Sequence, residues 1–175
     1  WEVKLSPASA ASFVLHVELG EGVFDFTDLP VEDVYLLGDS TRIEVEFNRP
    51  NLIDCERFKL SMIGGEMEFR GLLNAKAKSI TLQLPRTKAR VEITGKPFEG
   101  ASEIWFEGTP ESLEIVVSKK VGVRVSGLTA NVVRFNRKGM QIDGSSLINE
   151  GYRDKACKVH LHFARPVPKL DVEWD

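Results

Sequence analysis

The stretch Leu19–Phe26, Leu-Gly-Glu-Gly-Val-Phe-Asp-Phe, joins an alternating apolar segment that ends at Leu19 to a second one that begins at Val23. Apolar side chains at every second position are typical of a β-strand with one buried face. Gly20 and Gly22 supply backbone conformations with positive φ at little steric cost. The stretch therefore predicts two strands joined by a glycine corner.

This strand-corner-strand unit recurs to the C-terminus. A first type of alternating segment occurs seven times, at Leu15/Val17/Leu19, Val34/Leu36, Phe58/Leu60/Met62, Ile80/Leu82/Leu84, Ile104/Phe106, Val121/Val123/Val125 and Val159/Leu161/Phe163. Each is followed by Gly or Pro turn residues and a second type, at Phe24/Phe26, Ile43/Val45/Phe47, Met67/Phe69, Val91/Ile93, Leu113/Ile115/Val117, Val133/Phe135 and Leu170/Val172/Trp174. The second-type segments begin at residues 24, 43, 67, 91, 113, 133 and 170, so five of the six steps lie near 22 residues. A repeat of that length is typical of a solenoid.

These repeats predict an all-β, stacked β-solenoid of about seven two-strand rungs that form two parallel sheets around a narrow core. The alternative is an antiparallel β-sandwich of hairpins. We expect residues 1–12 to form a tail or edge strand and residues 13–175 to form one domain. The long last step indicates an inserted loop at 136–156 with a short strand at Met140–Ile142, and helix content should be very low.

Composition excludes several classes of protein. The 42% apolar and 28% charged content is ordinary for a soluble globular domain, and the net charge of -3 argues against a nucleic-acid-coating protein. No run approaches the roughly 20 apolar residues of a membrane-spanning helix. Because the chain begins at Trp1 rather than Met, we expect any signal or membrane anchor to lie in a segment outside it. Cys55 and Cys157 predict two buried or semi-buried thiols rather than a disulfide framework or a metal knuckle.

Several segments resemble the bacterial toast-rack domains of adhesin-like proteins and of the C-terminal domain of LiaF-like cell-wall-stress proteins. They are Leu15–Phe26, Ile63–Ala75, Val121–Gly127, Gly151-Tyr152 and Leu170–Trp174. The resemblance covers nearly the whole chain from residue 13. It implies a stacked β-solenoid, a cell-envelope setting outside the cytoplasm, and no known catalytic activity.

His160 and His162 are the strongest candidates for residues of a metal-binding or other functional site. Two residues apart on one strand, they point outward if Val159 and Leu161 point inward. If rungs stack in chain order about 4.8 Å apart, His16 lies six rungs, roughly 29 Å, from the pair, so the three histidines cannot share one metal ion. We therefore expect solvated surface histidines rather than a ligand pair, and we predict no metal site and no cofactor.

Trp105 also points outward, because its neighbours Ile104 and Phe106 point inward. An exposed indole can stack on a sugar or contact a protein partner, although a loop such as 95–102 often covers such a residue. We therefore single out Trp105, His160 and His162 as candidate residues for surface interaction.

The second-type strands also carry an outward row of carboxylates. It predicts a charged, solvated stripe, with residues Asp25, Glu44, Glu46, Glu68, Glu92, Glu114, Asp171 and Glu173. Such a row on a convex sheet offers no cleft for catalysis by paired carboxylates. Nucleophile-elbow, Walker, Rossmann and HExxH motifs are absent, so we predict no catalytic residues.

The sequence therefore favours a non-catalytic interaction domain of the cell envelope, with an adhesin-like or envelope-stress role. We expect a protein or cell-surface partner, no nucleic acid, and end-to-end self-association as an option left open. The alternative is a polysaccharide-binding or polysaccharide-active β-solenoid, and a third hypothesis is a purely structural spacer.

Overall fold

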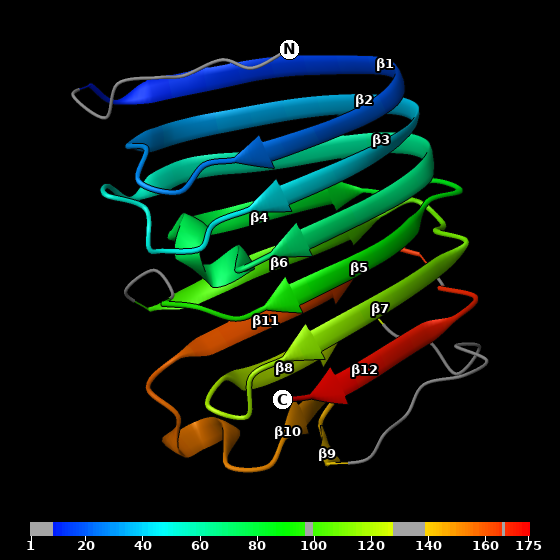
Figure 1. The fold of residues 1–175 in the computed structure, drawn as a ribbon. Coiled ribbons are helices and arrows are strands. Elements are labelled where there is room, and N and C mark those ends of the chain that lie inside the picture. The colour runs from blue at the N-terminus through cyan, green and yellow to red at the C-terminus, as the bar shows by residue number, and fades with distance from the viewer. Residues whose placement is uncertain (1–8, 97–99, 128–138, 166) are drawn as a thin grey trace.

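The computed structural model describes residues 9–96, 100–127, 139–165 and 167–175, which form the predicted stacked β-solenoid (Figure 1). The strands are β1 Ala11–Asp25, β2 Val31–Glu46, β3 Cys55–Arg70, β4 Ala77–Gln83, β5 Lys88–Ile93, β6 Ala101–Glu107, β7 Ser112–Val117, β8 Gly122–Ser126, β9 Met140–Asp143, β10 Ser146–Asn149, β11 Lys158–Phe163 and β12 Leu170–Trp174. The described helices are two short 3-10 helices, η1 Leu72–Ala75 and η2 Tyr152–Asp154. The fold class is thus confirmed.

In the first three rungs, the predicted glycine corners lie inside the continuous strands β1, β2 and β3 rather than between separate strands. β1 pairs with β2 in parallel almost without interruption from Ala11 to Asp25, and the register places Gly20 beside Thr41 and Thr41 beside Gly65. Gly65 has a φ of 80°, and a Cβ atom there would lie 2.0 Å from the Thr41 carbonyl oxygen. The corner therefore requires glycine at Gly65, both for its positive φ and for the close approach of the next rung. Figure 1 shows β1, β2 and β3 bending at one edge of the solenoid, so that each contributes to both faces.

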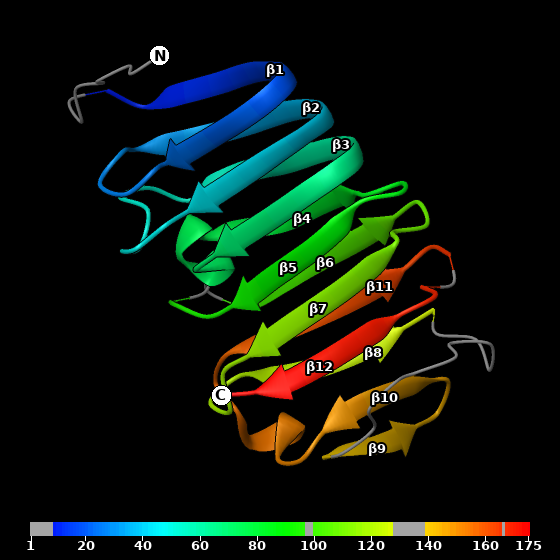
Figure 2. The same cartoon turned by 45° about the vertical axis from the view of Figure 1, so that its right-hand side comes forward.

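We call the two faces the back sheet and the front sheet. The back sheet contains the first halves of β1–β3, then β4, β6, β11 and β8, and the front sheet contains the second halves of β1–β3, then β5, β7 and β12. Every neighbouring pair within these two groups is parallel, which excludes the antiparallel sandwich. The antiparallel pairs among the described strands join β8 to β10 and β10 to β9, at the end of the solenoid opposite β1 (Figure 2).

The last strands do not stack in chain order, contrary to the sequence prediction. β11 lies between β6 and β8, and β12 lies beside β7. The physical reason is that the position of a strand in a parallel sheet depends mainly on an alternating pattern of buried apolar residues. Val159, Leu161 and Phe163 of β11 provide that pattern as well as the apolar residues of β8 do. The described residues thus complete six rungs, and the predicted Val133/Phe135 segment lies outside them. His16 is consequently five levels, about 24 Å, from His160, not six.

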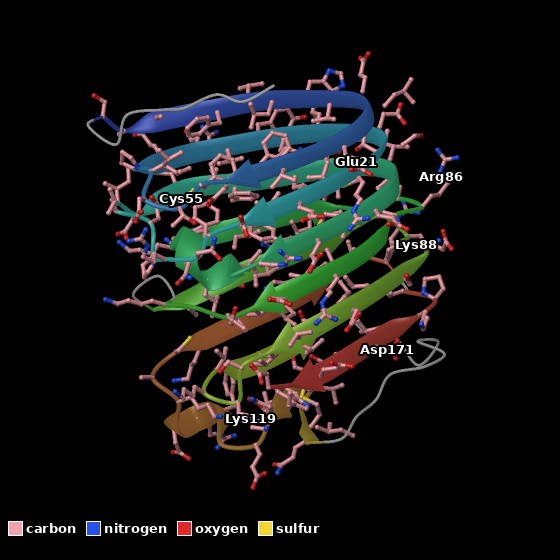
Figure 3. The ribbon with its side chains drawn as sticks, viewed as in Figure 1. Glu21, Cys55, Arg86, Lys88, Lys119 and Asp171 are labelled. Atoms are coloured by element: carbon pink, nitrogen blue, oxygen red, sulfur yellow. The ribbon has the colours of Figure 1, made fainter. Side chains whose placement is uncertain are left out.

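The inward side chains form one continuous apolar core with a phenylalanine cluster at Phe26, Phe47, Phe58 and Phe69. The predicted strand at residues 140–142 exists as β9. Both cysteines are free thiols, as predicted: Cys55 is buried (Figure 3), and Cys157 is half-buried. The predicted tail at residues 1–12 is described only from residue 9, and β1 begins at Ala11.

Candidate functional site

The candidate site lies on the outer face of the back sheet, where β6 and β11 are neighbours. Alternation buries Ile104 and Phe106 and turns Glu103 and Trp105 outward. On β11 the same alternation turns His160 and His162 outward. The parallel register places His160 beside Glu103 and His162 beside Trp105, so four chemically distinctive side chains gather on two adjacent strands.

A carboxylate connects the two imidazoles. Glu103 Oε1 lies 2.8 Å from His160 Nδ1, and Glu103 Oε2 lies 2.5 Å from His162 Nε2. Each ring also has a hydroxyl partner on its other nitrogen: the Tyr152 hydroxyl is 2.7 Å from His160 Nε2, and Ser126 Oγ is 2.9 Å from His162 Nδ1. With both imidazoles neutral, each ring donates an N–H to the carboxylate and accepts a hydrogen bond from a hydroxyl, so one assignment of protons satisfies the network.

Trp105 and His162 stack on each other. Their ring centroids are 4.0 Å apart with 13° between the ring planes, and Trp105 remains 41% exposed. The side chains of His160 and His162 are each 25% exposed, and that of Glu103 is 35% exposed. The cluster is therefore a half-buried polar network beside a solvent-exposed indole.

Burial raises the pKa of the Glu103 carboxyl, but the hydrogen bonds from His162 and His160, together with the positive charge of these rings when they are protonated, lower it by more, so that its pKa lies below its ordinary value. Glu103 is thus an ionised acceptor at neutral pH, which suits a role as the central anion of the cluster.

Local structure at the end of the solenoid positions Tyr152. Gly151, with a φ of 67°, precedes η2, which presents the Tyr152 ring to His160 at a centroid separation of 6.2 Å. Just before it, the buried Asn149 accepts a hydrogen bond from the Val123 N–H and donates one to the Val121 carbonyl. The segment that carries Tyr152 is thereby fixed against β8.

The three residues singled out from the sequence all lie in this cluster. Trp105 is outward and exposed as predicted, and residues 97–99 of the loop expected to cover it lie outside the described residues. The expectation of solvated histidines is wrong for His160 and His162, because each side chain is mostly buried and has hydrogen-bond partners on β6 and on β8 or η2.

Sequence reasoning missed Glu103, Tyr152 and Ser126. Alternation along 101–107 could have placed Glu103 on the face of Trp105, but only the strand order brings it to the histidines. No sequence pattern indicated that Tyr152 and Ser126 would lie beside the two histidines.

No family model, curated protein or solved structure matches this chain.

In the described part of the chain, no helix is long and apolar enough to cross a membrane.

The predicted acidic stripe on the front sheet is a ladder of mixed charge. Its central row has the register Glu44, Glu68, Arg90, Glu114 and Asp171. Arg90 pairs with Glu114 and, at 3.5 Å, with Glu92, while other arginines pair with Glu44 and Glu68. Lys88 and Asp171 mark this face in Figure 3. Lys169 pairs with Asp171 at 3.5 Å, so every charged residue of this row has an ion-pair partner within the chain.

Ser126, His162 and Glu103 also form a hydroxyl–imidazole–carboxylate series of the kind that activates a serine nucleophile. Two features oppose such a role: Glu103 is shared with His160, and Ser126 Oγ also lies 3.4 Å from the Leu161 carbonyl oxygen. The arrangement suits recognition or ion binding better than acyl transfer.

Proposed function

We propose that this chain is a non-catalytic interaction domain of the cell envelope that binds a protein or cell-surface component through the back sheet around Trp105. The observation that carries the proposal is the Trp105–His162 stack, in which an indole that is 41% exposed has a neighbour fixed by hydrogen bonds. A rigid exposed aromatic side chain provides contact area at low entropic cost. The resemblance to toast-rack domains supports the envelope setting.

The surroundings of Trp105 offer an extended contact surface. Parallel register aligns Tyr35, Lys59, Thr81, Trp105 and His162 in one outward row across the strands of the back sheet. Tyr35 and Trp105 are three levels apart, which is about 14 Å, and Lys59 lies over the Tyr35 ring. A row with an aromatic ring near each end suits an elongated ligand that crosses the strands.

This row also favours a second candidate function, the binding of a polysaccharide chain. Exposed aromatic rings with intervening polar side chains match the apolar faces and hydroxyl groups of sugars. The polysaccharide-active version has weaker support, because both oxygens of Glu103 accept hydrogen bonds from imidazoles and the neighbouring outward positions on β4 and β11 carry Ser79 and His160 rather than a second carboxylate.

Binding of the purified chain to intact bacterial cells, and to insoluble cell-wall polysaccharide in a co-sedimentation assay, tests the proposal. Trp105→Ala should weaken binding at least 10-fold. Val23→Ala is the matched control, because Val23 is 66% exposed on the front sheet and its truncation should leave binding unchanged. Equal binding by the wild type and Trp105→Ala would refute this surface, and binding to cells but not to polysaccharide would exclude the second candidate.

The proposal that the domain is non-catalytic needs a separate test, which uses the reactivity of the Ser126 hydroxyl. A fluorophosphonate probe labels an activated serine nucleophile covalently. We expect no labelling above that of Ser126→Ala. Labelling that disappears in both Ser126→Ala and Glu103→Gln would show an activated serine and overturn this part of the proposal.

A further inference from the structure

We propose that Glu103, His160 and His162 form a binding site for a divalent transition-metal ion of the Zn²⁺ class. This inference goes beyond the proposed interaction function and does not depend on it. One carboxylate oxygen of Glu103 and one nitrogen of each histidine all lie within 4.8 Å of one another. The three donor groups therefore lie together between β6 and β11, close enough to share one ion after small side-chain shifts.

Two imidazoles and one carboxylate are a donor set that zinc uses in proteins, with bonds of about 2.0–2.2 Å. In a tetrahedral site with such bonds, ligand atoms are about 3.3 Å apart. Glu103 oxygens now lie 2.8 Å and 2.5 Å from the two nitrogens, so the carboxylate would move outward slightly while the imidazoles close together.

The backbone holds the donors in a rigid arrangement. His160 and His162 are two residues apart on β11, and the register sets Glu103 directly beside His160 on β6. β11 has a strand neighbour on both sides, since β8 pairs with its other edge. Sites built on paired strands keep their geometry better than sites on loops.

The outer partners of the imidazoles also fit metal binding. Histidine ligands usually donate the ring N–H that does not face the metal to a neighbouring acceptor, which fixes the tautomer. Here the Tyr152 hydroxyl would accept from His160 Nε2, and Ser126 Oγ would accept from His162 Nδ1. Both rings would exchange tautomer on binding the ion, and neither would need to lose a net proton when it starts neutral.

The positively charged side chains near the cluster interact with groups other than Glu103. Arg124 pairs with Asp143 at 3.2 Å and its guanidinium lies over the Tyr152 ring, and Lys158 also lies over that ring. The single charge of Glu103 thus stays available to the ion. Two nitrogen donors disfavour Ca²⁺ and Mg²⁺, which prefer oxygen, and favour Zn²⁺, Co²⁺, Ni²⁺ and Cu²⁺.

Calorimetric titration of the tag-free, chelator-treated chain with ZnSO₄ tests the site. We expect saturable binding of one ion per chain, weakened at least 10-fold in His160→Ala and in Glu103→Gln. His16→Ala is the matched control, because His16 lies five levels away and beside Glu18, and its loss should change nothing. Ser126→Ala and Tyr152→Phe should each weaken binding about 10-fold or more, through the outer hydrogen bonds.

Co²⁺ gives an independent readout. Its visible absorption should show a low-symmetry nitrogen–oxygen site in the wild type and in His16→Ala, and the hydrated ion in His160→Ala. Cu²⁺ should quench the fluorescence of Trp105, and Trp105→Phe should remove that response while Zn²⁺ still binds. Circular dichroism checks that each variant folds.

Absence of saturable Zn²⁺ binding, or binding that persists unchanged in a folded His160→Ala variant, would overturn the inference. The outcome is separable from that of the proposed function. If the wild type binds zinc and Trp105→Ala still binds the partner normally, only the interaction surface is contradicted. If Trp105→Ala loses partner binding but the wild type does not bind zinc, only the metal site is contradicted.

Discussion

Truncation of Phe47 to alanine should remove a large part of the stability of the solenoid. The Phe47 side chain is 1% exposed, and its ring centroid lies 5.3 Å from that of Phe26, 6.1 Å from that of Phe58 and 6.4 Å from that of Phe69. Burying a phenylalanine stabilises a fold by about 1.5–3 kcal/mol, and each aromatic pair adds about 0.5–1.5 kcal/mol. Core Phe→Ala changes commonly cost about 3–5 kcal/mol, and with three ring partners we expect a loss of about 4–5 kcal/mol here.

Urea unfolding followed by circular dichroism measures this loss, and two further variants test its cause. Phe47→Leu keeps most of the apolar volume and loses only the ring pairs, so it should cost about 1.5 kcal/mol. Phe13→Ala removes a half-buried ring of β1 that pairs with Phe26 at 5.3 Å, so it should cost about 1–2 kcal/mol. If Phe13→Ala proved as costly as Phe47→Ala, stability would not follow burial and ring packing, and this reasoning would fail.

Two further predictions concern titratable groups. Burial raises the pKa of the Cys55 thiol to about 12 and also raises that of the less buried Cys157, so a thiol reagent at pH 8 should label Cys157 first. Cys157→Ser should abolish most labelling of the folded chain, and rapid labelling of Cys55 before urea is added would contradict its burial. The Arg57 hydrogen bond lowers the pKa of Asp33 below its usual 3.8, despite an opposing effect of burial. The stabilisation from this carboxylate is therefore fully present above about pH 4 and is lost as the pH falls through the lowered value, and the stability difference between the wild type and Asp33→Asn should shrink over that acid range. A difference that stays constant down to pH 2 would show that the pair does not shift this pKa.

The sequence predicted the solenoid because alternation and glycine corners are local properties. Gly65 illustrates this well: a position that needs positive φ and tolerates no Cβ is visible as a glycine in a repeated place. The order of the last rungs is not local. The apolar residues of β8 and β11 present nearly the same inward pattern, so periodicity cannot say which strand lies beside β6.

That ambiguity is also why only part of the site could be predicted. Trp105, His160 and His162 stood out as unusual outward residues on their own strands. Glu103 is an ordinary outward glutamate unless β11 is placed beside β6. In chain order, β8 would separate the two strands and put Glu103 two levels, about 10 Å, from His160. The sequence thus contained the side chains of the cluster, and the tertiary strand order determined their contacts.

The inserted position of β11 connects the site to the integrity of the fold. Among the described strands, β8 pairs with β11 and β10 and with no other, so β8 joins the rest of the back sheet through β11. His160 and His162 on β11 contact Glu103 on β6 at one side and Ser126 on β8 at the other. Anything that binds Glu103, His160 and His162 together would therefore join β6 to β11 at the junction where chain order is broken, and the Ser126–His162 hydrogen bond would extend that link to β8. A site at this junction links ligand binding to the docking of the C-terminal strands, which a site on β1–β3 would not do.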